Sequence, residues 1–148
     1  MECVKRMALG EPLVDMVERE QIITDTCTFF DLDLYTAKVS DLNFANKYSL
    51  KFEKTDTIHA LTCWFDAYFS KLKNPVLLST SPYSKTTHWR QVVFYLDKPI
   101  SVKHGQTLSG TIAVKKSAIH FRDLDITTSY HYNDGISNVN FKQMYKLK

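Results

Sequence analysis

The stretch Leu124-Asp125-Ile126-Thr127-Thr128-Ser129-Tyr130-His131-Tyr132-Asn133 decides the fold, together with the run from Val139 to Leu147 that follows it. In both runs, apolar or aromatic residues alternate with polar ones. Successive side chains of a strand point to opposite faces, so each run has one apolar and one polar face. Asn133-Asp134-Gly135 between them is a turn signal. The region predicts an antiparallel hairpin with one face in water.

The same alternation recurs upstream of this hairpin, in residues 30–34, 48–52 and 108–115. Turn signals lie between the runs at Asp97-Lys98-Pro99 and at Lys103-His104-Gly105-Gln106. Repeated short strands separated by turns are typical of all-β proteins. The chain is therefore predicted to form an antiparallel β-barrel or sandwich of about ten strands.

Two stretches lack simple alternation. Ile58 to Phe69 is apolar on both faces, so periodicity alone does not distinguish a strand from a helix; its aromatic content favours one long strand. Near the N-terminus, Val4, Met7 and Ala8 have helical spacing and Pro12 disfavours helix at the preceding residue. We expect a short N-terminal helix that ends near Gly10.

The bulk composition excludes several classes of protein. With 148 residues and 44% apolar residues, one globular domain is expected. The net charge of +3, with scattered basic residues, gives no support for direct nucleic-acid binding. No run approaches the roughly 20 apolar residues of a membrane span, and charges interrupt any signal-peptide pattern. Three distant cysteines predict reduced, buried thiols in an intracellular protein.

Few motifs in the sequence carry chemistry. The four glycines are not clustered, so a nucleotide-type cofactor site is not expected within the chain. The five histidines show no metal-ligand spacing, so no metal site is predicted. The polar segment Ser79–Arg90 lies directly before a strand-like run, with His88 and Trp89 at the junction. A loop histidine is by itself more often structural, but loops carried on a rigid scaffold are common sites of function.

Ser79–Pro82 and Thr87–Trp89 resemble the Thr-His-Trp loop region of the type I protein arginine methyltransferases. The similarity extends over nearly the whole chain. Five further parts of the chain carry it: the arm-like Cys3–Asp15, the strand-like Asp33–Val39, the long strand with His59–Leu61 and Trp64-Phe65, and the hairpin-like Gly110–Ile112 and Arg122–Asp125.

The resemblance implies that residues 1–12 are the end of a dimerisation-arm helix and that residues 13–148 are the β-barrel domain. It also implies that the Rossmann-like domain that binds S-adenosylmethionine is outside this chain. The implied function is the acceptor side of an S-adenosylmethionine-dependent arginine N-methyltransferase acting on histone or Arg/Gly-rich proteins. We expect no cofactor in this chain, and we expect the chain alone to be inactive.

By the same resemblance, His88 is the catalytic residue and pairs with a carboxylate from the other half, whereas Thr87 and Trp89 bind the substrate arginine. A guanidinium has five N–H donors and a delocalised charge, which suit a carboxylate clamp and an aromatic wall. Lys85 departs from the family loop, which often carries an acidic residue.

The expected partners are arginine-containing protein substrates, the catalytic domain of the parent enzyme, and other copies of the chain in an arrangement that differs from the family's usual dimer. The expected location is the cytoplasm or nucleus. An isolated barrel is expected to expose apolar surface around Phe29, Trp89 and Phe94. The alternatives are a stand-alone, non-catalytic protein- or peptide-binding barrel and, on the tyrosine and tryptophan content, a carbohydrate-binding sandwich.

Overall fold

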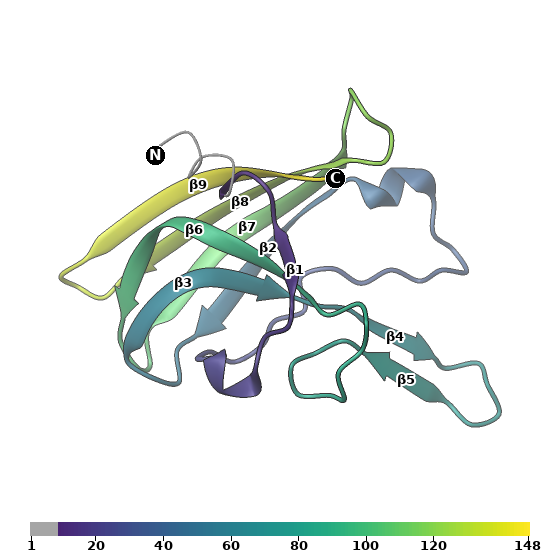
Figure 1. Ribbon diagram of the computed structural model, residues 1–148, viewed down its shortest axis with the longest axis horizontal. Coiled ribbons are helices and arrows are strands. Elements are labelled where there is room, and N and C mark those ends of the chain that lie inside the picture. Colours follow the sequence, from purple (N-terminus) through teal and green to yellow (C-terminus); the bar gives the residue numbers. More distant parts are fainter. Residues whose placement is uncertain (1–8) are drawn as a thin grey trace.

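The computed structural model describes residues 9–148, whose regular structure is almost all strand, with long connecting segments between the strands (Figure 1). The nine strands within this range are β1 Leu13–Asp15, β2 Phe44–Lys51, β3 Asp56–Cys63, β4 Asp66–Phe69, β5 Val76–Ser79, β6 Gln91–Val102, β7 Thr107–Lys116, β8 Leu124–Asn133 and β9 Asn138–Leu147. Two short 3₁₀ helices are η1 Arg19–Gln21 and η2 Val39–Leu42. No helix in this range is long and apolar enough to cross a membrane.

The largest sheet has four antiparallel strands in the order β2-β7-β8-β9. It contains the predicted hairpin, since β8 pairs with β9 from Leu124↔Leu147 to Asn133↔Asn138. The turns at Gly105 and Gly135 are confirmed, and both glycines have a positive φ of 80° and 84°. That backbone region costs other residues steric strain, which explains glycine there.

A second sheet has the order β1-β6-β3, and β4 pairs only with β5. The prediction of a strand for Ile58–Phe69 is confirmed, but the prediction of one continuous strand is wrong. The strand breaks at Trp64-Phe65 into β3 and β4. The cause is Thr80, whose N–H and hydroxyl both donate to the Phe65 carbonyl at 3.0 and 2.9 Å. These bonds turn the chain away from β6.

The predicted turn at Asp97-Lys98-Pro99 is also wrong, because β6 continues through it to Val102. The ladder with β3 is interrupted there: Ile58 pairs with Ile100, whereas Ala60 pairs with Tyr95. The extra residues of β6 form a bulge. Proline has no N–H to offer a ladder, and a bulge is a position in a sheet where it is tolerated.

The strands expected at residues 30–34 and Asp33–Val39 are not formed. Asp33 instead makes a turn, in which its carboxylate accepts the Tyr35 N–H at 3.0 Å and its carbonyl accepts the Ala37 N–H at 2.9 Å. Leu34 and Tyr35 are 83% and 80% exposed, so alternation here has no sheet to pack against. The predicted N-terminal helix falls mostly on residues 1–8, outside the described residues.

The core lies between the two larger sheets and is rich in aromatic rings. Phe94 of β6 meets Tyr145 of β9 edge-on at 5.1 Å, and Phe52 meets Tyr132 at 5.9 Å. The sheets are joined at this edge by side chains, since Gln143 Nε2 and the Tyr145 hydroxyl both donate to the Tyr95 carbonyl at 3.0 Å. The expectation of an exposed Phe94 is therefore wrong: it is 3% exposed and faces the core.

Candidate functional site

The loop between β5 and β6 is fixed at its start by a buried threonine. Thr80 is 2% exposed, and its Oγ1 accepts the Phe65 N–H at 3.1 Å while donating to the Phe65 carbonyl. Ser81 and Ser84 close the next turn, with the Ser84 N–H donating to the Ser81 carbonyl at 3.1 Å. Pro82 follows Ser81, where its fixed φ favours a turn. The loop thus begins from a rigid position at the β3–β4 break.

The end of the loop is fixed by Gln91, the first residue of β6, which is 5% exposed. Its Nε2 donates to the Thr80 carbonyl at 2.8 Å, and its Oε1 accepts the Val17 N–H at 2.8 Å. One side-chain amide therefore ties both ends of the loop together and connects them to the segment after β1. Buried polar groups that are fully paired in this way rigidify their surroundings.

The sequence-predicted residues lie in the last turn of this loop. The Arg90 N–H donates to the Thr87 carbonyl at 3.3 Å, so His88 and Trp89 occupy the two central positions of the turn. Arg90 has a φ of 54°, a left-handed conformation that costs a non-glycine residue roughly 1–2 kcal/mol. Strained backbone persists where surrounding structure enforces it, often at functional sites. The turn presents both side chains outward.

An aromatic surface surrounds the turn. The His88 and Trp89 rings lie 4.1 Å apart, and Trp89, 48% exposed, meets Phe65 edge-on at 6.1 Å. Trp64 meets Tyr83 at 6.3 Å, and the Arg19 guanidinium lies 5.5 Å from the centre of the Tyr83 ring. Faces of Trp and Tyr attract cations, and Arg19 already uses one in this way. The surface is chemically suited to a guanidinium.

The hydroxyl of Thr87 lacks a hydrogen-bond partner within the described residues. Its oxygen, Oγ1, is buried. Buried hydroxyls in folded proteins are almost always paired, and an orphan one calls for a further group.

Thr87, His88 and Trp89 lie together in the structure because they are adjacent in sequence. The site also includes residues that were not predicted from the sequence. Gln91, Tyr83, Trp64 and Phe65 hold or surround the turn. The unusual Trp-Phe pair at a strand break was the available signal. Burial raises the pKa of the Cys63 thiol, next to Trp64 in the chain, to about 12, which disfavours its thiolate form. Within the described chain, no three His, Cys, Asp or Glu side chains gather as metal ligands.

A family comparison matches residues 1–135 to the arginine methyltransferase oligomerization subdomain. The chain belongs to this family. Over 148 residues it is 34% identical to protein arginine N-methyltransferase 8-B of Danio rerio, covering all of this chain and 35% of that protein. Over 130 residues it is 42% identical to protein arginine N-methyltransferase 1 of Schizosaccharomyces pombe, covering 88% of this chain and 38% of that protein. The chain thus spans less than half the length of these curated relatives.

Solved structures share the fold. The Trypanosoma brucei PRMT1 enzyme-prozyme heterotetrameric complex with AdoHcy aligns with a TM-score of 0.92 at 34% identity, over 97% of this chain and 45% of that one. An open conformation of Arabidopsis thaliana protein arginine methyltransferase 10 aligns with a TM-score of 0.91 at 22% identity, over 99% of this chain and 45% of that one, which supports the fold alone. The all-β arginine methyltransferase fold expected from the sequence is therefore confirmed.

S-adenosylmethionine, the methyl donor expected for such enzymes, does not fit the residues present. Sites for nucleotide-type cofactors use a glycine-rich turn at a helix N-terminus. In residues 10–148 the only helical elements are η1 and η2, of 3 and 4 residues. Gly105 and Gly135 lie in hairpin turns, and Gly110 lies inside β7. No step of donor chemistry is assigned to these residues.

Proposed function

We propose that this chain is the acceptor-side β-barrel part of an S-adenosylmethionine-dependent protein arginine N-methyltransferase. The reaction moves a methyl group from a sulfonium to a guanidinium nitrogen of arginine in proteins such as histones or Arg/Gly-rich proteins. The observation that carries the proposal is the rigid Thr87–Trp89 turn on an aromatic surface, with an orphan hydroxyl beside it. Membership of the family supports it.

Each residue of the turn has a distinct role in this proposal. Trp89 offers its half-exposed ring as one wall for the planar guanidinium. His88 is the catalytic residue of this chain and hydrogen-bonds to a carboxylate supplied by the donor-binding part. Thr87 Oγ1 bonds to a group at the same junction, which removes the cost of burying it unpaired. Methyl transfer needs the acceptor nitrogen held in line with the donor methyl group, and in this proposal the turn supplies the acceptor side of that arrangement.

The chain alone neither binds the donor nor transfers a methyl group. Residues 13–148 act as the barrel, and activity requires the donor-binding part that the full-length relatives contain. The chain functions in an oligomer, as the name of the family and the heterotetrameric T. brucei relative suggest. Its place of action is the cytoplasm or nucleus, in keeping with Cys27 and Cys63, which are free thiols.

A second candidate is a stand-alone binding module that holds proteins or peptides without catalysis. The observation in its favour is that Trp89, Tyr83 and Phe65 are each close to half exposed, with the Phe65 and Trp89 rings in edge-on contact. Exposed aromatic patches are common at interaction sites. This reading uses the same turn but needs no donor-binding part.

A chimera distinguishes the two. The barrel of the 42% identical S. pombe relative is replaced by this chain, and methyl transfer to an arginine-rich protein is measured. We expect transfer by the chimera and none by this chain alone. Titration calorimetry of this chain with S-adenosylmethionine should give no saturable heat. Saturable donor binding by this chain, or a folded chimera that binds donor and substrate without transfer, would contradict the proposal.

A further inference from the structure

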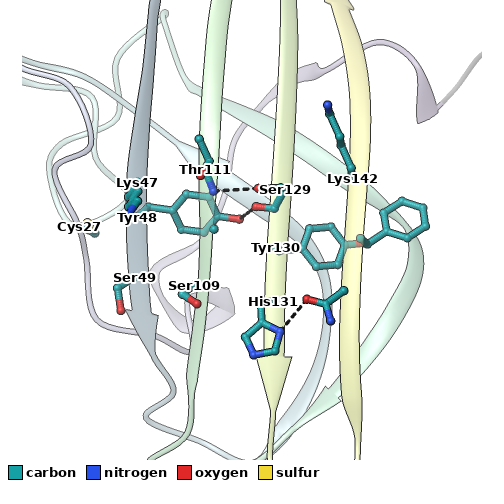
Figure 2. A pocket seen from close by; sticks show the side chains of 13 residues that line it. Cys27, Lys47, Tyr48, Ser49, Ser109, Thr111, Ser129, Tyr130, His131 and Lys142 are labelled. Carbon is teal, nitrogen blue, oxygen red and sulfur yellow. Dashed lines mark hydrogen bonds between the residues drawn. The ribbon is translucent and has the colours of Figure 1, made fainter.

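The polar face of the four-stranded sheet carries a groove that runs across the strands, away from the Thr87–Trp89 turn. The strand register defines its two walls. One row is formed by Lys47, Thr111, Ser129 and Lys142 on successive strands. The other row is formed by Ser49, Ser109, His131 and Asn140. Figure 2 shows both rows along β2, β7, β8 and β9, and together they line a hollow of about 890 Å³.

In the first row, the central strands carry the small side chains of Thr111 and Ser129 between two long lysines, which leaves the middle of the face low. The floor is the backbone row that includes Gly110. A Cβ at Gly110 would overlap the Ser129 carbonyl and the Tyr48 hydroxyl, so only glycine fits. The Tyr48 hydroxyl donates to the Ser129 carbonyl at 2.9 Å across Gly110 (Figure 2). This bond and the Tyr48 ring support the floor from the core side.

The charge on this face is one-sided. Five lysines on the four strands point to it: Lys47, Lys51, Lys115, Lys142 and Lys146. Its one carboxylate is Asp125, which lies in register between Lys115 and Lys146. The face therefore carries 5 − 1 = +4, and the rest of the chain carries 14 − 15 = −1, from totals of 19 basic and 16 acidic residues. Within residues 9–148, no ion pair involves any of these five lysines.

We propose that this groove docks an acidic segment of a partner polypeptide. Lys47 and Lys142 mark its two ends, and the hydroxyls of Ser109, Thr111 and Ser129 lie between them. Four adjacent strands span about 14 Å, which is about four residues of an extended chain. Acidic side chains four residues apart would therefore meet both terminal lysines at once.

The groove favours a polypeptide over a nucleic acid because of what its walls offer. Proteins that bind single-stranded nucleic acid combine cations with exposed aromatic platforms on which bases stack. The two rows offer hydroxyl, amide, imidazole and ammonium groups, and the three aromatic residues that also line the hollow, Tyr48, Tyr130 and Phe141, pack in or against the core. His131 is held by its Nδ1 to Asn140 Oδ1 at 2.7 Å, so its Nε2 is turned to solvent as a further polar contact (Figure 2).

Fluorescence anisotropy with this chain tests the proposal. The probe is a fluorescein-labelled 12-residue peptide with glutamate at every fourth position. The comparison probes are the same peptide with glutamine and a labelled decathymidine. The test variant is K47E/K142E, and the matched control is K71E/K73E, which makes the same change in net charge on the exposed loop between β4 and β5. Thermal melts check folding, and K47Q/K142Q replaces the test variant if it fails to fold.

Of the three probes, we expect only the glutamate peptide to bind saturably. We expect K47E/K142E to weaken its affinity about tenfold, and the control variant to weaken it less than about twofold. Binding should weaken as salt is raised, since exposed charges are screened. Three results would overturn the proposal: no saturable binding of the glutamate peptide, equal loss in both variants, or tighter binding of decathymidine.

Discussion

Two connecting segments of this chain match the family sequence, and they are held in different ways. The Thr80–Arg90 loop is tied by buried side chains to the segment after β1, to the β3–β4 break and to its own ends. The segment 30–39 makes a turn at Asp33 and leaves Leu34, Tyr35 and Val39 about four-fifths exposed. The conformation of the Thr80–Arg90 loop is therefore fixed by contacts within the described chain. The second segment carries three apolar side chains that the rest of residues 9–148 leaves largely uncovered.

The difference shows why a family motif is useful only with its supporting contacts. His88 and Trp89 are positioned because Thr80 and Gln91 leave the loop few alternatives, and such preorganisation is what acceptor sites require. Leu34 and Tyr35 have the apolar character of an interface. Large exposed apolar side chains in a group mark surfaces that another chain or domain covers.

The largest expected effect is on the anchored loop. Gln91→Leu leaves the Thr80 carbonyl and the Val17 N–H without their partner, and each unpaired buried group costs about 1–3 kcal/mol, so we expect a loss of about 2–4 kcal/mol. Urea unfolding measures it. Gln106→Leu in the exposed β6–β7 turn is the control and should change stability by less than about 0.5 kcal/mol. Equal losses for the two variants would remove the special role of Gln91.

A smaller loss is expected at the other anchor. Thr80→Val keeps the shape of the side chain but removes both bonds of the hydroxyl to Phe65, which should cost about 1–2 kcal/mol. Thr80→Ser keeps the hydroxyl and should recover most of it. Chemical denaturation of the two variants measures the difference in their free energies of unfolding. If serine and valine are equally destabilising, the hydroxyl is not the anchor.

The β8–β9 turn contains a charged anchor, Asp134, whereas the anchors at Gln91 and Thr80 are neutral. Bonds from the Ser137 N–H, the Lys103 ammonium and the Ile136 N–H lower the pKa of Asp134 to about 2 from its ordinary 3.8. Its stabilising contribution is complete above the unfolded value and is lost as pH falls through the folded value. Asp134→Asn should therefore lower the melting temperature at pH 7. The gap to the parent should shrink below about pH 4 and be lost only below about pH 2; a gap independent of pH would argue against the ionised form.

The smallest effect is expected in the segment 30–39. Replacing Leu34 and Tyr35 together with serine should change the free energy of unfolding by less than about 0.5 kcal/mol, because both side chains are exposed. The same variant should reduce any self-association seen by light scattering. A loss comparable to that of Gln91→Leu would mean that the segment is packed within the chain and would undo the comparison.

Much of the fold was readable from local pattern. Alternation in β2, β7, β8 and β9 gives a sheet with one buried face, because side-chain direction follows sequence position directly. Local sequence patterns gave the wrong answer where tertiary contacts determine the structure. Residues 30–34 alternate but have no neighbouring strand to pair with, and Pro99 reads as a turn yet lies within a bulge of β6.

The site was readable only in part. Thr87, His88 and Trp89 were found because they are adjacent and carry a family-like motif. Gln91 was not, since its function depends on two backbone groups, at Thr80 and Val17, that the fold alone brings to it. Trp64 and Tyr83 are distant in sequence and meet only because the chain leaves β6 at Phe65. Contacts of this kind have no local signature.

In the proposed function, the Thr87–Trp89 turn completes an acceptor-arginine site. The most direct measurement is kcat/KM for methyl transfer by the chimera carrying His88→Ala, beside the same chimera carrying His104→Ala in the exposed β6–β7 turn. We predict a fall of about a hundredfold or more for His88→Ala, because a positioned histidine contributes 10²–10⁴-fold to such sites, and a change of less than about twofold for His104→Ala. Equal kcat/KM values for the two folded variants would contradict the assignment.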